Sequence, residues 1–212
     1  MKQKINAALY AYWNDVRDGR IAPRRFDIEP SRIGDLLPHT FMLERSGGQN
    51  FRFRLAGTSL CEQFHADFRG ANFIEGWDGD DALTLARQFE VMTSQGGVVL
   101  LTLEARSEGA LKIEFEVIVL PLVHTQESVD RYLGAMSAIN PPANLGSEPL
   151  TRKRLVHHEV IWPDGRPHKI VDRVCRQVPF LPHVRHARIV RSDRRQFRVY
   201  EGGLAKPDGE KF

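Results

Sequence analysis

The sequence predicts an α+β domain, in which a five-stranded antiparallel sheet carries helices on one face, with an N-terminal helix before it and a basic C-terminal extension after it. Pairs of alternating apolar and polar segments, joined by short glycine-containing turns, are typical of antiparallel hairpins. Two helical patterns follow the second strand, so the predicted order of elements is β-β-α-α-β-β-β. A stretch with three prolines at 140–149 then reads as a linker.

The N-terminal segment predicts an amphipathic helix. Ile5, Leu9, Trp13 and Val16 recur at steps of four, four and three residues, which places them on one stripe of a helix. The pair Asp18-Gly19 supplies a signal for the C-terminal end of this helix.

A second, shorter helix is predicted before the first strand. Ser31 can cap its N-terminus, Ile33, Leu36 and Leu37 supply its apolar residues, and Pro38 ends it.

The first two strands form a predicted hairpin. The strand at 39–45 is followed by the turn SGGQN and then by FRFRL at 51–55, where Phe51, Phe53 and Leu55 alternate with arginines. This hairpin has one apolar face. We expect the glycine after the second strand to let the chain bend over into the helices.

Two helices follow, of which the second is the longer. Residues 58–64 predict a short helix capped by one of its first two residues, and residues 80–97 predict a helix that ends at two glycines. Leu85, Phe89 and Met92 lie on one face of the long helix, which therefore packs on the sheet.

Three more strands are predicted at 98–106, 110–122 and 131–139. A three-residue loop between the first two would place Glu104 opposite Lys112, so that opposite charges meet and apolar residues meet. A five-residue loop would oppose like charges instead. We therefore expect the three-residue loop.

The outward face of the strand at 110–122 changes from charged to apolar residues along its length, so it needs a cover. The N-terminal helix is the expected cover, from its own chain or from a neighbour in a homodimer. The residues expected at this interface are Ile5, Leu9, Trp13, Val16, Ile118 and Leu120.

Charge is distributed unevenly along the 212 residues. Residues 1–150 hold 15 Lys and Arg against 20 Asp and Glu, whereas 151–212 hold 15 against 7, which gives −5 and +8 within a net charge of +3. We divide the chain into an N-terminal helix and connector at 1–30, a domain at 31–140, and a linker with a basic extension at 141–212.

Familiar chemical motifs are missing from the sequence. Cys61 and Cys175 lie far apart and outside any zinc-ligand spacing, and His157, His158 and Glu159 are neighbours whose side chains would alternate between two faces of a strand. Hydrolase, zinc-protease, phosphate-loop and dinucleotide motifs are absent, so we expect no metal site and no enzyme. Without a long apolar run or a signal peptide, a cytoplasmic protein is expected.

The order of elements and the stretch FRFRLAGTSLCEQFHADFRGANF (51–73) resemble PAS domains. The likeness is greatest to the PAS_5-like single-PAS proteins common in alphaproteobacteria, where a helix like LYAYWNDVRDGRIAPRRFDIEP (9–30) precedes the domain. The likeness covers residues 5–140. It implies a non-enzymatic sensory or signalling module that acts through protein contacts, with an interior between helices and sheet where such domains can hold a ligand.

Two interpretations of this interior stay open, a pocket for a small apolar ligand and a fully packed core. Asn72 and Trp77 are the polar-tipped candidates to orient a ligand, although Asn72 also suits a turn. The residues expected around the interior are Phe53, Leu55, Leu60, Phe64, Asn72, Phe73, Trp77, Leu85, Phe89, Leu101, Leu103 and Phe115.

The resemblance also bears on cofactors. Haem-binding PAS relatives often use a histidine on the long helix, and residues 80–97 contain none. Flavin photoreceptors of the light-oxygen-voltage class carry a reactive cysteine where this chain has Phe73. We therefore expect neither haem nor a covalently bound flavin, and the identity of any ligand stays unknown.

The extension predicts two arginine-rich hairpins, at 155–174 and 184–203. We expect an arm that lies on the acidic body or on a signalling partner. The alternative is a regulator that binds nucleic acid or a nucleotide, because RSDRRQFRV resembles the arginine motif of PilZ cyclic-di-GMP receptors, although their DxSxxG element is absent. The arginines of this alternative are Arg191, Arg194, Arg195 and Arg198.

Overall fold

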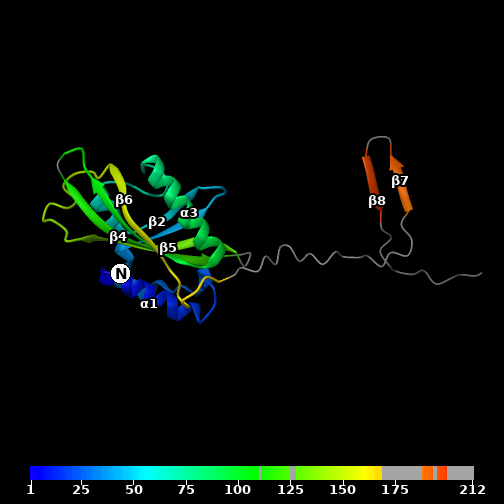
Figure 1. Cartoon of the computed structure of the whole chain (residues 1–212), viewed down its shortest axis with the longest axis horizontal. Coiled ribbons are helices and arrows are strands. Elements are labelled where there is room, and N and C mark those ends of the chain that lie inside the picture. Colours follow the sequence, from blue (N-terminus) through cyan, green and yellow to red (C-terminus); the bar gives the residue numbers. More distant parts are fainter. Residues whose placement is uncertain (110, 125–127, 169–187, 193–194, 200–212) are drawn as a thin grey trace, which may run out of the picture. The chain divides into compact units, whose positions relative to one another are not determined.

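Figure 1 shows the computed structural model of the chain, which divides into a unit at Met1–Ile170 and a unit at Val171–Phe212. The structure describes residues 1–109, 111–124, 128–168, 188–192 and 195–199, the last two ranges as backbone only.

The described part of the first unit contains a six-stranded sheet and three α-helices, and the predicted order of elements and α+β class are confirmed. The helices are α1 (Lys4–Arg17), α2 (Thr58–Phe64) and α3 (Gly79–Gln95), with 3-10 segments η1 (Arg25–Asp27) and η2 (Pro30–His39). The strands are β1 (Thr40–Arg45), β2 (Phe51–Ala56), β3 (Val98–Arg106), β4 (Lys112–Val123), β5 (Val129–Ile139) and β6 (Arg152–Ile161).

The sheet has the strand order β2-β1-β5-β4-β3-β6, and all neighbours are antiparallel. Strand β6 differs from the prediction, which placed it in a separate hairpin within the basic extension. It pairs with β3 instead, where Leu155 lies opposite Leu103 and Val160 opposite Val99. These apolar pairs extend the core to the edge of the sheet. Residues 169–174 of that predicted hairpin lie outside the described residues.

The predicted register of the β3–β4 hairpin is wrong. Glu104 lies opposite Glu114, and Arg106 lies opposite Lys112, which closes a five-residue loop after Arg106. The loop is closed by the Ser107 N–H, which donates to the Leu111 carbonyl at 3.1 Å. The expected ion pair still forms diagonally, because the Lys112 Nζ lies 2.6 Å from a Glu104 oxygen.

Helices cover both faces of the sheet (Figure 1), with α1 on one side and α3 on the other. The larger core contains Phe89 of α3 and Phe115 of β4, and the second core contains Trp13 of α1 and Leu120 of β4. Neighbouring residues of β4 therefore face different cores, as Val117 and Ile118 do.

Helix α1 confirms the prediction from the apolar stripe. It ends at Arg17, and its C-cap Asp18 adopts the left-handed conformation with φ 47°. Leu9 and Trp13 are completely buried, so the cover of the outer face comes from the same chain.

The predicted short helix after Ser31 is a 3-10 segment, η2, whose N-cap is Glu29 and which continues through Pro38. Its last carbonyls lie against the start of α2. A Cβ atom built on Gly57 would lie 2.2 Å from the Pro38 carbonyl oxygen and 2.3 Å from that of Leu37. Gly57 itself has an ordinary φ of −68°, so this position needs glycine for close approach and not for an unusual backbone angle.

The outer edge of β2 is bonded to the connection that follows α2. The Phe53 N–H donates to the Ala71 carbonyl at 2.9 Å, and the Gly70 N–H donates to the Phe53 carbonyl at 2.8 Å. The Phe73 N–H donates to the Phe51 carbonyl at 2.8 Å. This edge of the sheet is therefore paired by the chain itself.

The second unit contains a hairpin of β7 (Arg188–Ser192) and β8 (Arg195–Val199), with Ser192 opposite Arg195. This confirms the predicted strand pair there. Among the four arginines of the alternative function, Arg194 lies outside the described residues, as does Cys175, while Arg191, Arg195 and Arg198 are described as backbone only.

Candidate functional site

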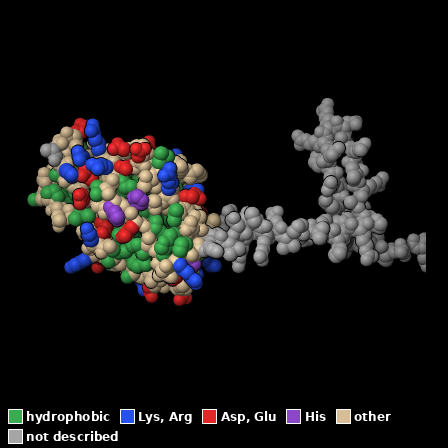
Figure 2. Space-filling model, viewed as in Figure 1, with side chains coloured by type: hydrophobic (Ala, Val, Ile, Leu, Met, Phe, Trp, Pro, Cys, Tyr) green, Lys and Arg blue, Asp and Glu red, His purple; other side chains and the backbone are tan. Residues whose placement is uncertain are grey.

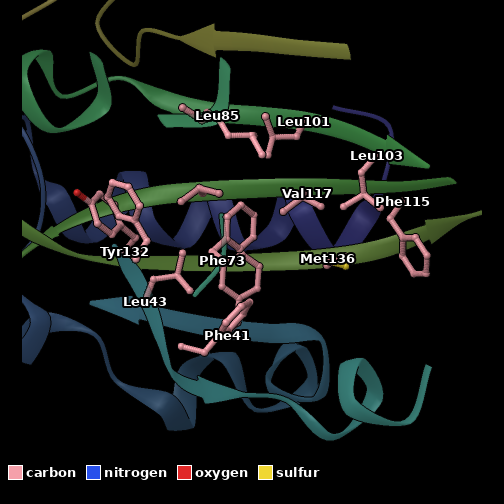
Figure 3. Close-up of a cluster of buried hydrophobic side chains, with 14 of the residues drawn as sticks. Phe41, Leu43, Phe73, Leu85, Leu101, Leu103, Phe115, Val117, Tyr132 and Met136 are labelled. Atoms are coloured by element: carbon pink, nitrogen blue, oxygen red, sulfur yellow. The ribbon is translucent and has the colours of Figure 1, made fainter. Parts of the chain in front are cut away.

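The interior between the helices and the sheet is filled by aromatic side chains. The rings of Phe51 and Phe89 lie with centroids 4.2 Å apart, and Phe89 also meets Tyr132 at 5.2 Å and Phe73 at 5.6 Å. Figure 3 shows Phe41 and Phe73 next to each other in this cluster, where their centroids are 5.9 Å apart. Rings at these distances are in contact and occupy the space between the layers.

Ten of the twelve residues predicted around the interior lie together in this cluster. They are Phe53, Leu60, Phe64, Phe73, Trp77, Leu85, Phe89, Leu101, Leu103 and Phe115. The polar tip of Trp77 is used within the chain, because its Nε1–H donates to the Phe73 carbonyl at 2.8 Å.

The other two predicted residues, Leu55 and Asn72, do not belong to this cluster. Leu55 is 52% exposed, because a bulge at Arg54 shifts the register between β1 and β2 and turns the next side chain to the opposite face. The Oδ1 of Asn72 accepts from the N–H groups of Phe51 at 3.0 Å and Ile74 at 3.3 Å, so this side chain organises the connection.

Phe73, which the resemblance sets at the place of a reactive cysteine, is buried among other rings. Cys61 lies half-buried on α2. His157 and His158 lie opposite Thr102 and Leu101 of β3, so they point to different faces of the sheet. No group of three or more metal-ligating side chains occurs in the described part of the chain.

A buried carboxylate that the sequence did not single out holds the start of α1 on the sheet. Glu116 is only 3% exposed, and its oxygens accept from the N–H groups of Lys2 at 2.7 Å and Gln3 at 2.9 Å. The Asn6 amide donates to the same carboxylate at 3.1 Å and to the Glu116 carbonyl at 3.0 Å. An anion at the N-terminus of a helix also interacts favourably with the helix dipole.

The middle of α1 has one polar contact to the sheet, where the Trp13 Nε1–H donates to the Pro121 carbonyl at 2.9 Å. Asn6 and Trp13 are seven residues apart, which is two helical turns, so their positions on one face were the signal available in the sequence. Glu116 gave no signal, because alternation assigned it to an exposed charged face.

The residues expected in a homodimer interface mostly pack within one chain. Leu9, Trp13, Ile118 and Leu120 are completely buried in the second core, and Ile5 and Val16 are half-buried against it. Self-association through this face would therefore require α1 to move.

We expect Glu116→Gln to weaken the docking of α1. The neutral amide keeps the shape of the side chain but loses the charge-assisted hydrogen bonds, which costs about 1–2 kcal/mol of the free energy of unfolding. Hydrogen exchange followed by mass spectrometry should show faster exchange of the α1 amides in the variant than in the wild type. The amides of α3 should exchange equally in both proteins. Equal exchange rates in α1 of both proteins would contradict this role of Glu116.

The turn after β6 forms an ion pair with the C-terminal end of α1. Asp164 accepts from both terminal nitrogens of Arg17, at 2.9 Å and 2.6 Å, and lies 2.5 Å from the Nε2 of His168. Arg17, with 5% of its side chain exposed, also contacts the ring of Trp13 at 5.8 Å. The hydrogen bond from Arg17, with a second from His168, lowers the pKa of Asp164 to about 2.

This shift predicts a pH dependence of stability. The pKa of Asp164 is lower in the folded chain than its ordinary value of 3.8, so its stabilising contribution is present above pH 3.8 and is lost as the pH falls through about 2. We expect Asp164→Asn to be less stable than the wild type at pH 7. The difference between their denaturant midpoints should shrink as the pH falls from 3.8 through about 2, and a constant difference over this range would contradict the assignment.

Among the residues that the structure describes, no helix is both long and apolar enough to cross a membrane.

An antiparallel sheet of order β2-β1-β5-β4-β3, with α2 and α3 over one face, defines the first unit as a PAS-type domain. Residues 1–137 match the sequence model of the family PAS_5, which is described as a PAS domain. Because this match spans more than half of the 212 residues, the chain belongs to that family.

Two solved structures are similar. The LOV protein of Rhodobacter sphaeroides has 13% identity and a TM-score of 0.40, over 50% of this chain and 61% of that protein. A single-substitution variant of RsLOV has 13% identity and a TM-score of 0.40, over 69% of this chain and 74% of that protein. The first match thus covers less than two thirds of the LOV protein. No curated protein sequence matches the chain.

Proposed function

We propose that the chain is a non-enzymatic sensory or signalling module that acts through protein contacts. The observation that supports this most is the cover on the outer face of the sheet. Helix α1 shields Ile118, Leu120 and Leu133, and these residues would present an apolar surface to a partner if the helix moved.

The sheet provides a physical link between the two cores. Val117 and Ile118 are consecutive in β4 and face opposite cores, so a change in packing over one face shifts the backbone that supports the other. A stimulus that favours one arrangement of α1 shifts the population of covered and uncovered states. The polar contacts of Glu116 and Trp13, together with the apolar burial of Leu9 and Trp13, set how much free energy this shift requires.

Protein contacts are a better-supported input than a small apolar ligand. A ligand in the interior would have to separate rings such as Phe51 and Phe89, whose centroids are 4.2 Å apart. Mass spectrometry of small molecules released from protein purified gently from its native cell tests this point. Stoichiometric recovery of an apolar molecule would favour the ligand as input.

In-cell photo-crosslinking tests the protein-contact function. A photoreactive amino acid at the exposed Ala11 of α1 should give a discrete adduct with one partner protein, or with a second copy of the chain as in a homodimer. The same probe combined with Glu116→Gln should change the yield of this adduct. A probe at the exposed Leu83 of α3 is the control. Equal adducts from both positions, or none from Ala11, would contradict the proposal.

A second candidate function uses the basic unit as a nucleic-acid or nucleotide binder. The arginine-containing hairpin of β7 and β8 favours it, and residues 151–212 carry 15 basic against 7 acidic residues. A deletion that tests it should begin at residue 171, because a deletion from 151 would remove β6 from the sheet. Loss of salt-sensitive DNA retention in this variant would support the second candidate, whereas an absence of retention in the full chain would exclude DNA.

A further inference from the structure

A surface pocket of about 480 Å³ lies where β6 begins, and most of its charged lining is basic. Arg106 of β3 and Arg152, Lys153 and Arg154 of β6 line it, against the acidic residues Asp78 and Glu104, and Trp77 forms part of its wall. Figure 2 shows Lys and Arg side chains gathered at one end of this unit.

The register of the sheet places like charges next to one another at this pocket. Arg152 lies opposite Arg106, and Arg106 lies opposite Lys112, so three cations form a row across β6, β3 and β4. Like charges directly opposite each other on a sheet destabilise the pairing. The folded chain therefore holds this row at a cost that a bound anion would offset.

The nearest buried carboxylate pairs with two of the three cations of the row and not with Arg152. Glu104, with 5% of its side chain exposed, lies 2.6 Å from both the Arg106 Nε and the Lys112 Nζ. The hydrogen bond from Lys112 and then that from Arg106 lower the pKa of Glu104, so it is ionised and fully engaged. Glu114, opposite Glu104, is exposed. Within the described part of the chain, Arg152 and Arg154 have no carboxylate within 4.0 Å.

Lys153, the fourth cation of the pocket, has a neutral hydrogen-bond partner and no carboxylate within 4.0 Å among the described residues. The Lys153 Nζ donates to the Glu75 carbonyl at 3.0 Å and lies 5.6 Å from the centre of the Trp77 ring. Burial lowers the pKa of Lys153. An ammonium group with this environment is available to a ligand that enters beside Trp77.

We propose that this pocket binds a small molecule that bears a phosphate group. Arginine side chains bind phosphate through paired N–H groups, and Arg152 and Arg154 on one strand can offer two such forks. The pocket has the volume of a small-molecule site, whereas nucleic acid is bound along an extended basic surface. The proposal does not depend on how the module signals, since none of its groups belongs to the contacts that dock α1.

The first experiment uses the wild-type chain and inorganic pyrophosphate at constant ionic strength. The chain has three tryptophans, so a ¹⁵N spectrum contains three indole N–H signals that Trp→Phe variants assign. Pyrophosphate should shift the Trp77 signal in a saturable manner and leave the buried Trp13 signal in place. Absence of a saturable shift at Trp77, or equal shifts at Trp13 and Trp77, would overturn the proposal.

The second experiment compares two double variants with the same change of charge. Arg152→Gln/Arg154→Gln removes the two guanidinium groups that are expected to bind the phosphate. Arg69→Gln/Arg87→Gln removes two exposed arginines outside the pocket. At ten times the dissociation constant, pyrophosphate should raise the melting temperature of the wild type and of the second variant by about 4 °C, and that of the first variant much less. Without pyrophosphate, the single variant Arg152→Gln should melt about 1–3 °C higher than the wild type, because the repulsion between Arg152 and Arg106 is gone while Arg154 keeps its place opposite Glu104.

Three outcomes would overturn the proposal. The first is an equal response of both variants to pyrophosphate, which would mean diffuse surface binding. The second is an unchanged or lower melting temperature of Arg152→Gln without ligand. The third is binding of a single-stranded oligonucleotide that depends on Arg152 and Arg154 while pyrophosphate has no effect, which would assign the cluster to nucleic acid.

Discussion

Gly57→Ala should destabilise the chain by about 3 kcal/mol, because the new methyl group would overlap backbone atoms that cannot rotate away. A Cβ atom at this position would lie 2.2 Å from the carbonyl oxygen of Pro38 and 2.3 Å from that of Leu37. Either η2 or the start of α2 must move, and the Gly57 N–H bond to the Thr40 carbonyl at 2.7 Å would be strained with it. Urea unfolding followed by circular dichroism measures the change in the free energy of unfolding.

Gly79→Ala is the matched control for this prediction. Gly79 opens α3, and among the described residues no atom beyond its chain neighbours and the backbone of its own helix lies within 4 Å of the position where its Cβ would be. Alanine there should leave stability unchanged or raise it by about 0.5 kcal/mol, through a less flexible unfolded chain. If both substitutions had similar small effects, the close approach of η2 to Gly57 would be wrong.

Trp13→Ala is the second substitution with a large expected effect. The indole is completely buried between α1 and the sheet, and its N–H is bonded to the Pro121 carbonyl at 2.9 Å. Truncation of a large buried aromatic side chain costs about 3–5 kcal/mol, part of which reflects the cavity that remains. Denaturant unfolding measures this loss, and limited proteolysis should cut within α1 before it cuts the sheet.

Trp13→Phe separates the two contributions, since it keeps most of the buried ring and removes the hydrogen bond. It should cost about 1–2 kcal/mol. The sequence alone placed Trp13 among the residues of an expected homodimer interface. Because Trp13 lies in the core of a single chain, a loss of stability in dilute protein is expected instead. A Trp13→Ala chain as stable as the wild type would show that α1 does not cover its own sheet.

Much of the fold followed from local patterns in the sequence. The stripe of Leu9 and Trp13 predicted α1, and alternation predicted β3 at 98–106, which the structure bounds at Val98 and Arg106. These patterns succeed because one face of each element is buried, and burial imposes a period on the residues.

The errors arose where a non-local contact outweighed a local pattern. One bulged residue, Arg54, was enough to place Leu55 outside. The β3–β4 register was chosen by opposing Glu104 to Lys112, yet the same ion pair forms along the diagonal, so charge did not discriminate between the two registers. Strand β6 could not be assigned to the sheet, since nothing within it specifies β3 as its neighbour.

In the candidate site, too, local patterns predicted some residues, and residues that depend on non-local contacts were missed. Ten of the residues expected around the interior lie together in one buried cluster, because apolar periodicity identifies buried positions. Glu116 and the basic pocket were missed, because each depends on residues from distant segments. Asn6 and Glu116 are 110 positions apart, and Arg106 meets Arg152 only through the pairing of β3 with β6.

The hydrogen bonds that line β2 also affect how the protein behaves at high concentration. A free strand edge is a template for runaway pairing between molecules, which leads to insoluble fibrous assemblies. Phe53 has both its backbone donor and its acceptor occupied by Ala71 and Gly70. Shortening or loosening that connection would therefore be expected to reduce colloidal solubility before it reduced the melting temperature.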